Sequence, residues 1–280
     1  MSESVNGKVA VVTGAGGTLC SVMAKNLAAQ GYKVALLGRS LDKLKVVEAE
    51  IIKSGGKAIS VSTDVADEAS VKAANYIIES EFGICNVLIN GAGGNQNDAL
   101  TNITEYDEKE LLNDGSVKGF FNLKMDVFKS VIEVNTMGTV IPSFIFGKGM
   151  ATLQRGVIIN IASMNSYKPL TKVGAYGIAK AGIANFTEWL AAYLAPANIR
   201  VNAIAPGFFL NDRSRKIMFN EDGSQTARAK AVLAHTPMKR FGEAPELIGC
   251  MNWLISEEAA GFVTGIVVPV DGGFLSTAGV

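Results

Sequence analysis

Tyr176 and Lys180 are the two residues of this sequence best suited to moving a proton. They stand at positions i and i+4 of AYGIAK, a segment of helical character, so both side chains project from one face. A free tyrosine has a pKa of about 10, and a nearby ammonium lowers that value by favouring the phenolate. We therefore expect Tyr176 to act as a general acid or base near neutral pH. Ser163 ends the preceding expected strand, where its hydroxyl could bind a substrate carbonyl oxygen.

A glycine-rich turn near the N-terminus is suited to binding a pyrophosphate. It spans residues 13–20, TGAGGTLC, between an apolar strand expected over residues 8–13 and a helix expected over residues 19–30. Glycines let the backbone approach a phosphate closely, and the first turn of the helix offers free N–H groups and a positive dipole. Placed between strand and helix, the turn indicates dinucleotide binding. The alternative is a turn that merely connects the two elements.

The end of the second expected strand bears on the choice of dinucleotide. Gly38 stands where an acidic side chain would hydrogen-bond the adenosine ribose and repel a 2′-phosphate, and Arg39 follows it. The Arg39 guanidinium could instead pair with a 2′-phosphate. These residues favour NADP(H) over NAD(H). The alternative is that Arg39 is an ordinary exposed arginine with no part in cofactor choice.

The elements that must position these groups alternate between strands and helices. Further apolar strands are expected over residues 33–37, 58–62, 87–90, 156–162, 200–205 and 267–270, and helices over residues 41–54, 68–82, 173–194 and 244–255. This alternation predicts an α/β fold, a Rossmann-type doubly wound parallel sheet with helices on both faces. Because no composition break marks a linker, we expect residues 1–280 to form a single dinucleotide-binding catalytic domain.

Two segments interrupt the alternation, the insertion (residues 95–124) and the lid segment (residues 208–242). Both follow expected strands, and ligands of open α/β sheets bind at the carboxyl ends of strands. Long connections in a compact domain are usually functional loops. The lid segment is therefore predicted to cover the substrate. The insertion is a second cover or a functional loop. For both segments the alternative is a surface insertion or a contact with another subunit.

Composition excludes several classes of protein. Lys and Arg total 26, as do Asp and Glu, so no basic excess is available to neutralise nucleic acid. The cysteines are few and far apart, which matches neither a disulfide framework nor a metal site and suggests a reducing compartment. Neither a secretory signal nor an apolar run long enough for a membrane span is present. We expect a cytoplasmic protein without a metal, acting on a small molecule.

In this order and at these spacings, the motifs resemble the short-chain dehydrogenase/reductase family over nearly the whole chain. The resemblance rests on the glycine turn, Ser163 and Tyr176-x-x-x-Lys180, and on further matches at Asp64-Val65, Asn90-Gly91-Ala92-Gly93, Asn135, Pro206-Gly207 and Asp271-Gly272-Gly273. It implies an oxidoreductase that transfers a hydride between a nicotinamide cofactor and a carbonyl or alcohol. It also implies a homotetramer.

The resemblance assigns roles to the matching positions. Tyr176 would be the general acid in carbonyl reduction and the base in alcohol oxidation. Lys180 would hold the nicotinamide ribose and keep the pKa of Tyr176 low. Ser163 would orient the substrate oxygen, and Asn135 would hold a water in a proton relay. Besides Tyr176, Lys180 and Arg39, the cofactor would contact Gly14, Gly17, Thr18, Leu19, Asp64, Val65, Asn90, Ala92, Gly93, Pro206 and Gly207.

The chain departs from the family pattern at four positions. Thr18 and Cys20 stand where glycines are usual, and Cys20 is expected to pack the helix somewhat less closely against the sheet. Gly91 replaces the second asparagine of the usual Asn-Asn-Ala-Gly, and Asn211 stands where a threonine often binds the carboxamide. These departures bear on cofactor affinity and leave every catalytic group in place.

Longer segments, among them IASMNSYKPLTKVGAY and LAHTPMKRFGEAPELIG, resemble the D-mannonate oxidoreductase (fructuronate reductase) branch of the family. This likeness implies interconversion of D-fructuronate and D-mannonate in hexuronate catabolism. The branch commonly has an acidic residue at the position of Gly38, so the likeness implies NAD(H), against the local residues. The alternatives are a reductase of another carbonyl, of gluconate or 3-oxoacyl type, and a non-catalytic NAD(P)-binding regulator.

A sugar-acid substrate needs a cation for its carboxylate and hydrogen-bonding groups for its hydroxyls. We expect Ser163, Asn165 and Tyr176 to contact the substrate. Lys172 or Arg215 is expected to meet the carboxylate.

Overall fold

The structure, a computed structural model, describes residues 5–112 and 114–277, apart from the side chains of residues 212 and 213. The strands are β1 Val9–Thr13, β2 Lys33–Gly38, β3 Lys57–Ser62, β4 Cys85–Asn90, β5 Gly156–Ile161, β6 Ile199–Pro206 and β7 Val267–Val270. The α-helices are α1 Thr18–Ala29, α2 Leu41–Lys53, α3 Glu68–Glu81, α4 Met125–Thr152, α5 Gly174–Leu194, α6 Asp212–Met218, α7 Ala227–His235, α8 Ile248–Ile255 and α9 Glu257–Ala260.

The strands form one parallel sheet in the order β3-β2-β1-β4-β5-β6-β7. The order reverses beside β1, and such a switch point is where ligands bind outside the carboxyl ends of the strands. Thr13 of β1 pairs with Asn90 of β4, and Asn90 pairs with Asn160 of β5. The register therefore brings the glycine turn, the loop after β4 and the segment after β5 to one edge of the sheet.

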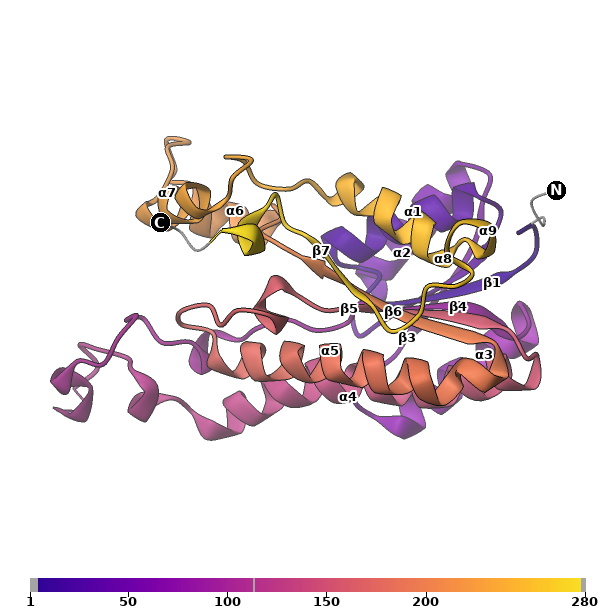
Figure 1. Cartoon of the computed structure of the whole chain (residues 1–280), viewed down its shortest axis with the longest axis horizontal. Helices are drawn as coiled ribbons and strands as arrows, with labels where there is room; N and C mark the ends of the chain where they lie inside the picture. The colour runs from indigo at the N-terminus through magenta and orange to yellow at the C-terminus, as the bar shows by residue number, and fades with distance from the viewer. Residues whose placement is uncertain (1–4, 113, 278–280) are drawn as a thin grey trace.

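Helices cover both faces of the sheet, with α1, α2 and α8 on one side and α3, α4 and α5 on the other (Figure 1). Alternate residues of β1 serve the two faces. Ala10 and Val12 join the hydrophobic core beneath α1, α2 and α8, and Val9 and Val11 join the core beneath α3, α4 and α5. Strands buried on both faces explain the nearly continuous apolar runs in the sequence. The predicted single-domain Rossmann-type fold is confirmed.

Local signals place most element ends within a few residues. Helix α1 ends just before Gly31, whose φ of +99° suits glycine, as the sequence predicts. The expected helix over residues 244–255 instead begins as a 3-10 turn, Ala244–Leu247, with Pro245 in its first positions, and continues as α8. Among the described residues, no helix combines the length and hydropathy needed to cross a bilayer.

The insertion and the lid segment both extend beyond one end of the sheet, the end at which α4 and α5 begin (Figure 1). The described residues of the insertion form three short 3-10 turns, Asn97–Ala99, Glu108–Leu112 and Phe120–Asn122. The buried Glu110 carboxylate accepts a hydrogen bond of 3.0 Å from the Phe121 N–H and fixes the turns to one another. The lid segment has a small core of its own around α6 and α7, formed by Leu210, Met218, Ala229, Val232 and Phe241.

Candidate active site

The carboxyl end of β5 and the start of α5 bring Ser163, Tyr176 and Lys180 together. Ser163 caps the 3-10 turn after β5, and its side chain hydrogen-bonds that of Tyr176. The Lys180 ammonium lies 5.4 Å from the centre of the Tyr176 ring, because residues four apart on α5 share a face. Lys180 is only 5% exposed, and its Nζ donates to the Ile161 carbonyl oxygen at 2.7 Å. The three predicted catalytic residues form one cluster.

Burial dominates the protonation of this cluster. Burial raises the pKa of Tyr176, and the hydrogen bond with Ser163 opposes that rise. Burial also lowers the pKa of Lys180 to about 8. The expectation that Lys180 keeps the pKa of Tyr176 low stays a prediction; in this structure the ammonium donates to the Ile161 carbonyl and lies over the tyrosine ring. Because burial raises its pKa, Tyr176 is a protonated phenol at neutral pH.

Asn165 supplies a buried donor beside Ser163. Its backbone N–H donates to Ser163 Oγ at 3.1 Å, and its side-chain Oδ1 accepts from the Leu170 N–H at 2.9 Å. The residue is 4% exposed, and its Nδ2 has no hydrogen-bond partner among the described residues. A buried donor without a partner costs about 1–3 kcal/mol, so it points to a ligand group that would accept from it.

Asn135 of α4 fastens the loop that follows β4. Its Nδ2 donates to the carbonyls of Gly94 at 2.7 Å and Val131 at 2.8 Å, and its Oδ1 accepts from the Gly94 N–H at 3.1 Å. A Cβ at Gly93 would overlap Asn135 Oδ1. The amide therefore shapes the loop that borders the cofactor region. The predicted role of Asn135 in holding a water stays a prediction.

The glycine turn approaches the loop after β4 too closely for a side chain. Gly14 has a φ of +67°, and a Cβ there would lie 2.9 Å from the backbone of Ala92. Thr13 Oγ1 accepts from the N–H groups of Gly91 at 3.0 Å and Ala92 at 3.1 Å. Thr13 therefore holds the glycine turn against the loop after β4, a role that its place at the end of a buried strand could have indicated.

Helix α1 begins with its first N–H groups available to an anion. Gly17 is the N-cap, and neither a side-chain cap nor an acidic residue occupies the first turn. Thr18 is exposed, and Leu19 is half-buried behind it. Free N–H groups and the helix dipole at such an end suit a pyrophosphate.

A cavity of about 360 Å³ continues from this turn across the ends of β2, β3 and β4. Arg39 is exposed at its edge, and in the described part of the chain no hydrogen bond or ion pair engages its guanidinium. Predicted cofactor residues make up half of the lining, namely Gly14, Arg39, Asp64, Val65, Ala92 and Gly93. The other half consists of residues that sequence motifs do not mark as cofactor contacts: Gly38, Thr63, Gly94, Asn95, Gln96 and Val134.

Asn90 does not line this cavity, unlike its predicted neighbours. Its Nδ2 donates to Ser143 Oγ and to Asn160 Oδ1, both at 2.9 Å, and the residue is buried. The side chain links β4 to β5 and α4 inside the core. The predicted contact of Asn90 with the cofactor therefore stays a prediction that this side-chain geometry does not support.

Gly207 follows β6 and packs closely against the end of β7. Its N–H donates to the Val270 carbonyl at 2.9 Å, and a Cβ would lie 2.6 Å from Asp271 Cα. The Pro206-Gly207 turn is thereby held at the end of the sheet next to the lid segment. Asn211 is the N-cap of α6, where its side chain accepts from the Ser214 N–H at 2.8 Å.

The structure gives both candidate carboxylate-binding residues other partners. Lys172, whose φ is +74°, donates through Nζ to the Asn102 carbonyl of the insertion at 2.7 Å. Arg215 Nη2 lies 3.6 Å from Glu243 Oε1 on the surface of the lid segment. Neither partner saturates its cation, since an ammonium has three donors and a guanidinium has five.

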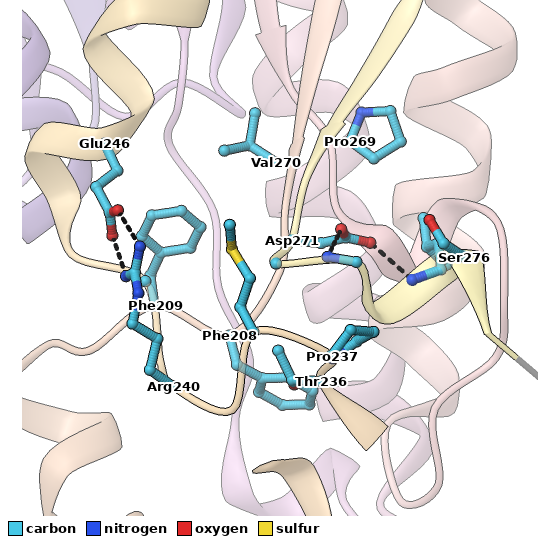
Figure 2. Close-up of a pocket in the computed structure, with 15 residues that line it drawn as sticks. Phe208, Phe209, Thr236, Pro237, Arg240, Glu246, Pro269, Val270, Asp271 and Ser276 are labelled. Atoms are coloured by element: carbon cyan, nitrogen blue, oxygen red, sulfur yellow. Dashed lines mark hydrogen bonds and ion pairs between the residues drawn. The ribbon is translucent and has the colours of Figure 1, made fainter. Parts of the chain in front are cut away.

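A second cavity, of about 800 Å³, lies between the lid segment and the C-terminal turn after β7. Figure 2 shows the ion pair of Arg240 and Glu246 on one wall and Asp271 on the opposite wall. The Asp271 carboxylate accepts from the N–H groups of Gly273 and Leu275, both at 2.8 Å. Each of these charged groups already has a hydrogen-bond partner, and none of the catalytic cluster lines the cavity. This cavity is therefore separate from the candidate reaction centre around Tyr176.

A doubly wound parallel sheet, a glycine turn at a helix N-terminus and a Ser-Tyr-Lys cluster define a dinucleotide-dependent oxidoreductase. The family model described as short chain dehydrogenase matches residues 8–222. The chain belongs to the short-chain dehydrogenase/reductase family, whose members are NAD(P)-dependent oxidoreductases.

Relatives cover the whole chain. An uncharacterised oxidoreductase of Bacillus subtilis, UxuB, is 45% identical and the alignment covers 100% of this chain and 99% of the relative. A 2-dehydro-3-deoxy-D-gluconate 5-dehydrogenase of Formosa agariphila is 34% identical over 98% of this chain and 95% of its own. A crystal structure from Haemophilus influenza with bound NAD, provisionally described as a D-mannonate oxidoreductase, is 42% identical with a TM-score of 0.94, covering 99% and 98% of the two chains.

Proposed function

We propose that the protein interconverts a keto sugar acid and its hydroxy acid, D-fructuronate and D-mannonate, by hydride transfer with a nicotinamide dinucleotide. The observation that carries the chemistry is the hydrogen-bonded Ser163–Tyr176 pair with Lys180 buried beside it. The choice of sugar acid rests on the likeness of the full chain to the Haemophilus structure. The gluconate-type relative, at lower identity, supports the broader class of sugar acid.

The cofactor region fits a dinucleotide on the chain's own geometry. The first turn of α1 and Thr18 would hold the pyrophosphate, and the cavity lined by Asp64, Val65 and Ala92 would hold the adenosine. Lys180 would donate to the nicotinamide ribose, and Pro206-Gly207 would border the nicotinamide. When bound, the nicotinamide supplies or accepts the hydride.

The protein's residues handle the substrate oxygen and its proton. Ser163 and Tyr176 would both hydrogen-bond the carbonyl oxygen, which places it where charge develops. Tyr176 then donates its proton to that oxygen in reduction and removes it in oxidation. Asn165 Nδ2, a buried donor without a partner among the described residues, would bind a neighbouring hydroxyl. The insertion and the lid segment would exclude water from the side of the substrate that faces away from Ser163 and Tyr176.

The decisive experiment is a cofactor absorbance assay of the purified protein. D-mannonate is offered with NAD⁺ and with NADP⁺, and D-gluconate and a 3-oxoacyl thioester are offered with the matching form of the cofactor. Turnover with D-mannonate at the highest kcat/KM is the expected result. A higher kcat/KM for either of the other substrates would replace the sugar-acid assignment and keep the catalytic cluster. Dinucleotide binding without turnover on a wider carbonyl panel would favour the regulator.

Residues 38 and 39 should set the choice between NADP(H) and NAD(H), and we propose a preference for NADP(H). Replacing Arg39 by alanine should lower kcat/KM for NADP(H) by roughly 10- to 100-fold, since hydrogen bonds to a charged group contribute about 1.5–3 kcal/mol. The value for NAD(H) should change little. Gly38→Asp is the complementary variant, since a Cβ at Gly38 lies 3.6 Å from Leu44 Cδ2, an ordinary contact. It should lower kcat/KM for NADP(H) and raise it for NAD(H).

Kinetics with both cofactors measure these effects, and Lys43→Ala, on the first turn of α2, is the control for loss of a nearby positive charge. The NAD bound to the Haemophilus relative makes the opposite preference a real outcome. An unchanged cofactor ratio in Arg39→Ala would show that the arginine does not reach the 2′-phosphate.

Lys172 and Arg215 should differ in their effect on the substrate carboxylate. We propose Lys172 as the residue that binds it, because Lys172 lies four residues before Tyr176 in the sequence and keeps two ammonium donors beyond its bond to Asn102. Lys172→Met should raise KM for D-mannonate by roughly tenfold or more. Arg215→Met, which removes a surface ion pair with Glu243, should leave KM nearly unchanged. The reverse pattern would assign the carboxylate to Arg215.

A homotetramer is the proposed assembly. The outer face of α4 and α5 exposes Phe144, Trp189 and Tyr193. Trp189 stacks on Tyr193 with ring centres 5.4 Å apart. Contiguous exposed aromatic side chains commonly mark a subunit contact. Light scattering on the purified protein tests the number of chains.

A further inference from the structure

Two of the departures from the family pattern touch each other. Cys20 in the first turn of α1 and Gly91 in the loop after β4 are 71 positions apart in the sequence. A Cβ built on Gly91 would overlap the Cys20 sulfur. Cys20 is 5% exposed, so this sulfur lies inside the molecule between the helix and the loop. The larger residue at position 20 and the smaller residue at position 91 are therefore two parts of one packing arrangement.

Position 91 is enclosed on its other sides as well. A Cβ there would lie 3.2 Å from the Thr13 carbonyl oxygen and 3.4 Å from Ile161 Cγ1. The Gly91 N–H donates to Thr13 Oγ1 at 3.0 Å. The Ile161 carbonyl in turn accepts from Lys180 Nζ at 2.7 Å. The sulfur therefore lies in the layer of atoms between the glycine turn and the residue that holds the catalytic ammonium.

The Cys20 thiol is a neutral filler in this position. Burial raises its pKa to about 12, with the nearby charge of Lys180 acting in the opposite direction. A thiol with so high a pKa is neither a nucleophile nor readily oxidised. Its contribution is volume, and volume in a packed core is felt at the scale of one methyl group. This replaces the expectation that Cys20 loosens the packing of the helix.

We propose that Cys20 is a positioning residue of the cofactor site, whose sulfur takes the place of the side chain missing at position 91 and thereby fixes the glycine turn, the loop after β4 and Lys180 relative to one another. The consequence is reciprocal. A side chain at position 91 is incompatible with Cys20, and removal of the Cys20 sulfur leaves a space that a methyl group at position 91 fills. The effect on the cofactor rests on the proposed function, whereas the packing of the pair does not.

The test is a double-mutant cycle of Cys20→Ala and Gly91→Ala. Two quantities are measured for each variant, the midpoint of thermal unfolding without cofactor and the dissociation constant of NADPH or NADH from protein fluorescence. Gly91→Ala alone should weaken cofactor binding by about tenfold, in keeping with the cost of overpacking a core. In the double variant, the dissociation constant should return to within about threefold, and the unfolding midpoint to within a few degrees, of the values for the unmutated protein.

Cys85→Ala is the matched control. Cys85 is also a buried free thiol, but it begins β4 at the opposite end of the strand from Gly91. The variant Cys85→Ala/Gly91→Ala should stay as weak in binding as Gly91→Ala. Should Gly91→Ala not fold, the comparison of the two double variants still decides, because only the one lacking the Cys20 sulfur should fold and bind.

A second readout separates positioning from general stability. In Cys20→Ala the dissociation constant of the dinucleotide should rise, whereas Cys85→Ala should lower the unfolding midpoint and leave that dissociation constant in place. The proposal would be overturned if Gly91→Ala changed the dissociation constant and the unfolding midpoint equally in the presence and in the absence of the Cys20 sulfur. If no variant binds a dinucleotide, the proposed function fails, and the unfolding midpoints alone decide whether the pair is coupled.

Discussion

Replacing Tyr176 by phenylalanine should lower kcat by about 10²–10⁴-fold, the usual contribution of a positioned general acid or base. The substitution removes only the phenol hydroxyl group, and the hydrogen bond from Lys180 to the Ile161 carbonyl remains. The cofactor dissociation constant should therefore change little. Tyr193→Phe is the matched control, because it removes a hydroxyl from an exposed tyrosine on the same helix. Steady-state kinetics and a binding titration on both variants measure the difference.

The same residue predicts opposite pH profiles for the two directions. Because burial raises the pKa of Tyr176, the phenol stays protonated through neutral pH and the proton donor for carbonyl reduction is always present. Alcohol oxidation needs the phenolate, so its kcat should rise steadily as pH increases toward the raised pKa. Lys180 also titrates in this range, but Tyr176→Phe retains it. A rise with pH that survives in Tyr176→Phe would contradict the assignment of Tyr176 as the base.

The sequence predicted the parts of the site that depend on local pattern. Short β-branched runs located the strands, Gly31 located the end of α1, and the spacing of Tyr176 and Lys180 placed both on one helix face. These features follow from periodicity and glycine conformation within a few residues of chain. The parallel order of strands then brought the glycine turn and Ser163 to one edge without further information.

The features that the sequence could not predict are contacts between segments far apart in the chain. The Asn135 amide bonds Gly94, and Lys172 reaches Asn102, contacts that span 41 and 70 positions. Asn90 turns into the core, because Ser143 and Asn160 offer it partners there. Burial of Tyr176, which raises its pKa, is likewise a property of the packed molecule that residue spacing alone does not show. Each of these differences comes from tertiary packing that overrides a sound local argument.

Replacing Lys180 by methionine should reduce kcat/KM by about 10²-fold or more and at the same time stabilise the cofactor-free protein near neutral pH. The activity falls because the ammonium that would hold the nicotinamide ribose is gone, and hydrogen bonds to a charged group contribute about 1.5–3 kcal/mol each. The stability rises because the Lys180 ammonium is costly to keep out of water. The residue is only 5% exposed, and in the described structure its Nζ donates to the Ile161 carbonyl. Methionine fills a similar volume without that cost.

The pH dependence of the gain in stability follows from the lowered pKa. In the folded protein the pKa of Lys180 is about 8, below the value of 10.5 for a free lysine. Between these two values the unfolded chain binds more protons than the folded one, so the unmutated protein gains stability as pH rises through this window. Below about pH 8 the penalty is fully present, and it is the penalty that Lys180→Met removes. The advantage of the variant should therefore be largest near pH 7 and vanish toward pH 10.5.

Thermal unfolding of both proteins from pH 7 to pH 10 measures this convergence. Lys168→Met is the control, since Lys168 is an exposed lysine whose Nζ donates to backbone carbonyls of the C-terminal turn. It should show no convergence with pH. A Lys180→Met protein less stable than the parent at pH 7 would mean that the Ile161 hydrogen bond outweighs the burial of the charge. The expected result would instead identify Lys180 as a residue kept for catalysis at a cost in stability, because its buried charge is useful when a dinucleotide is bound.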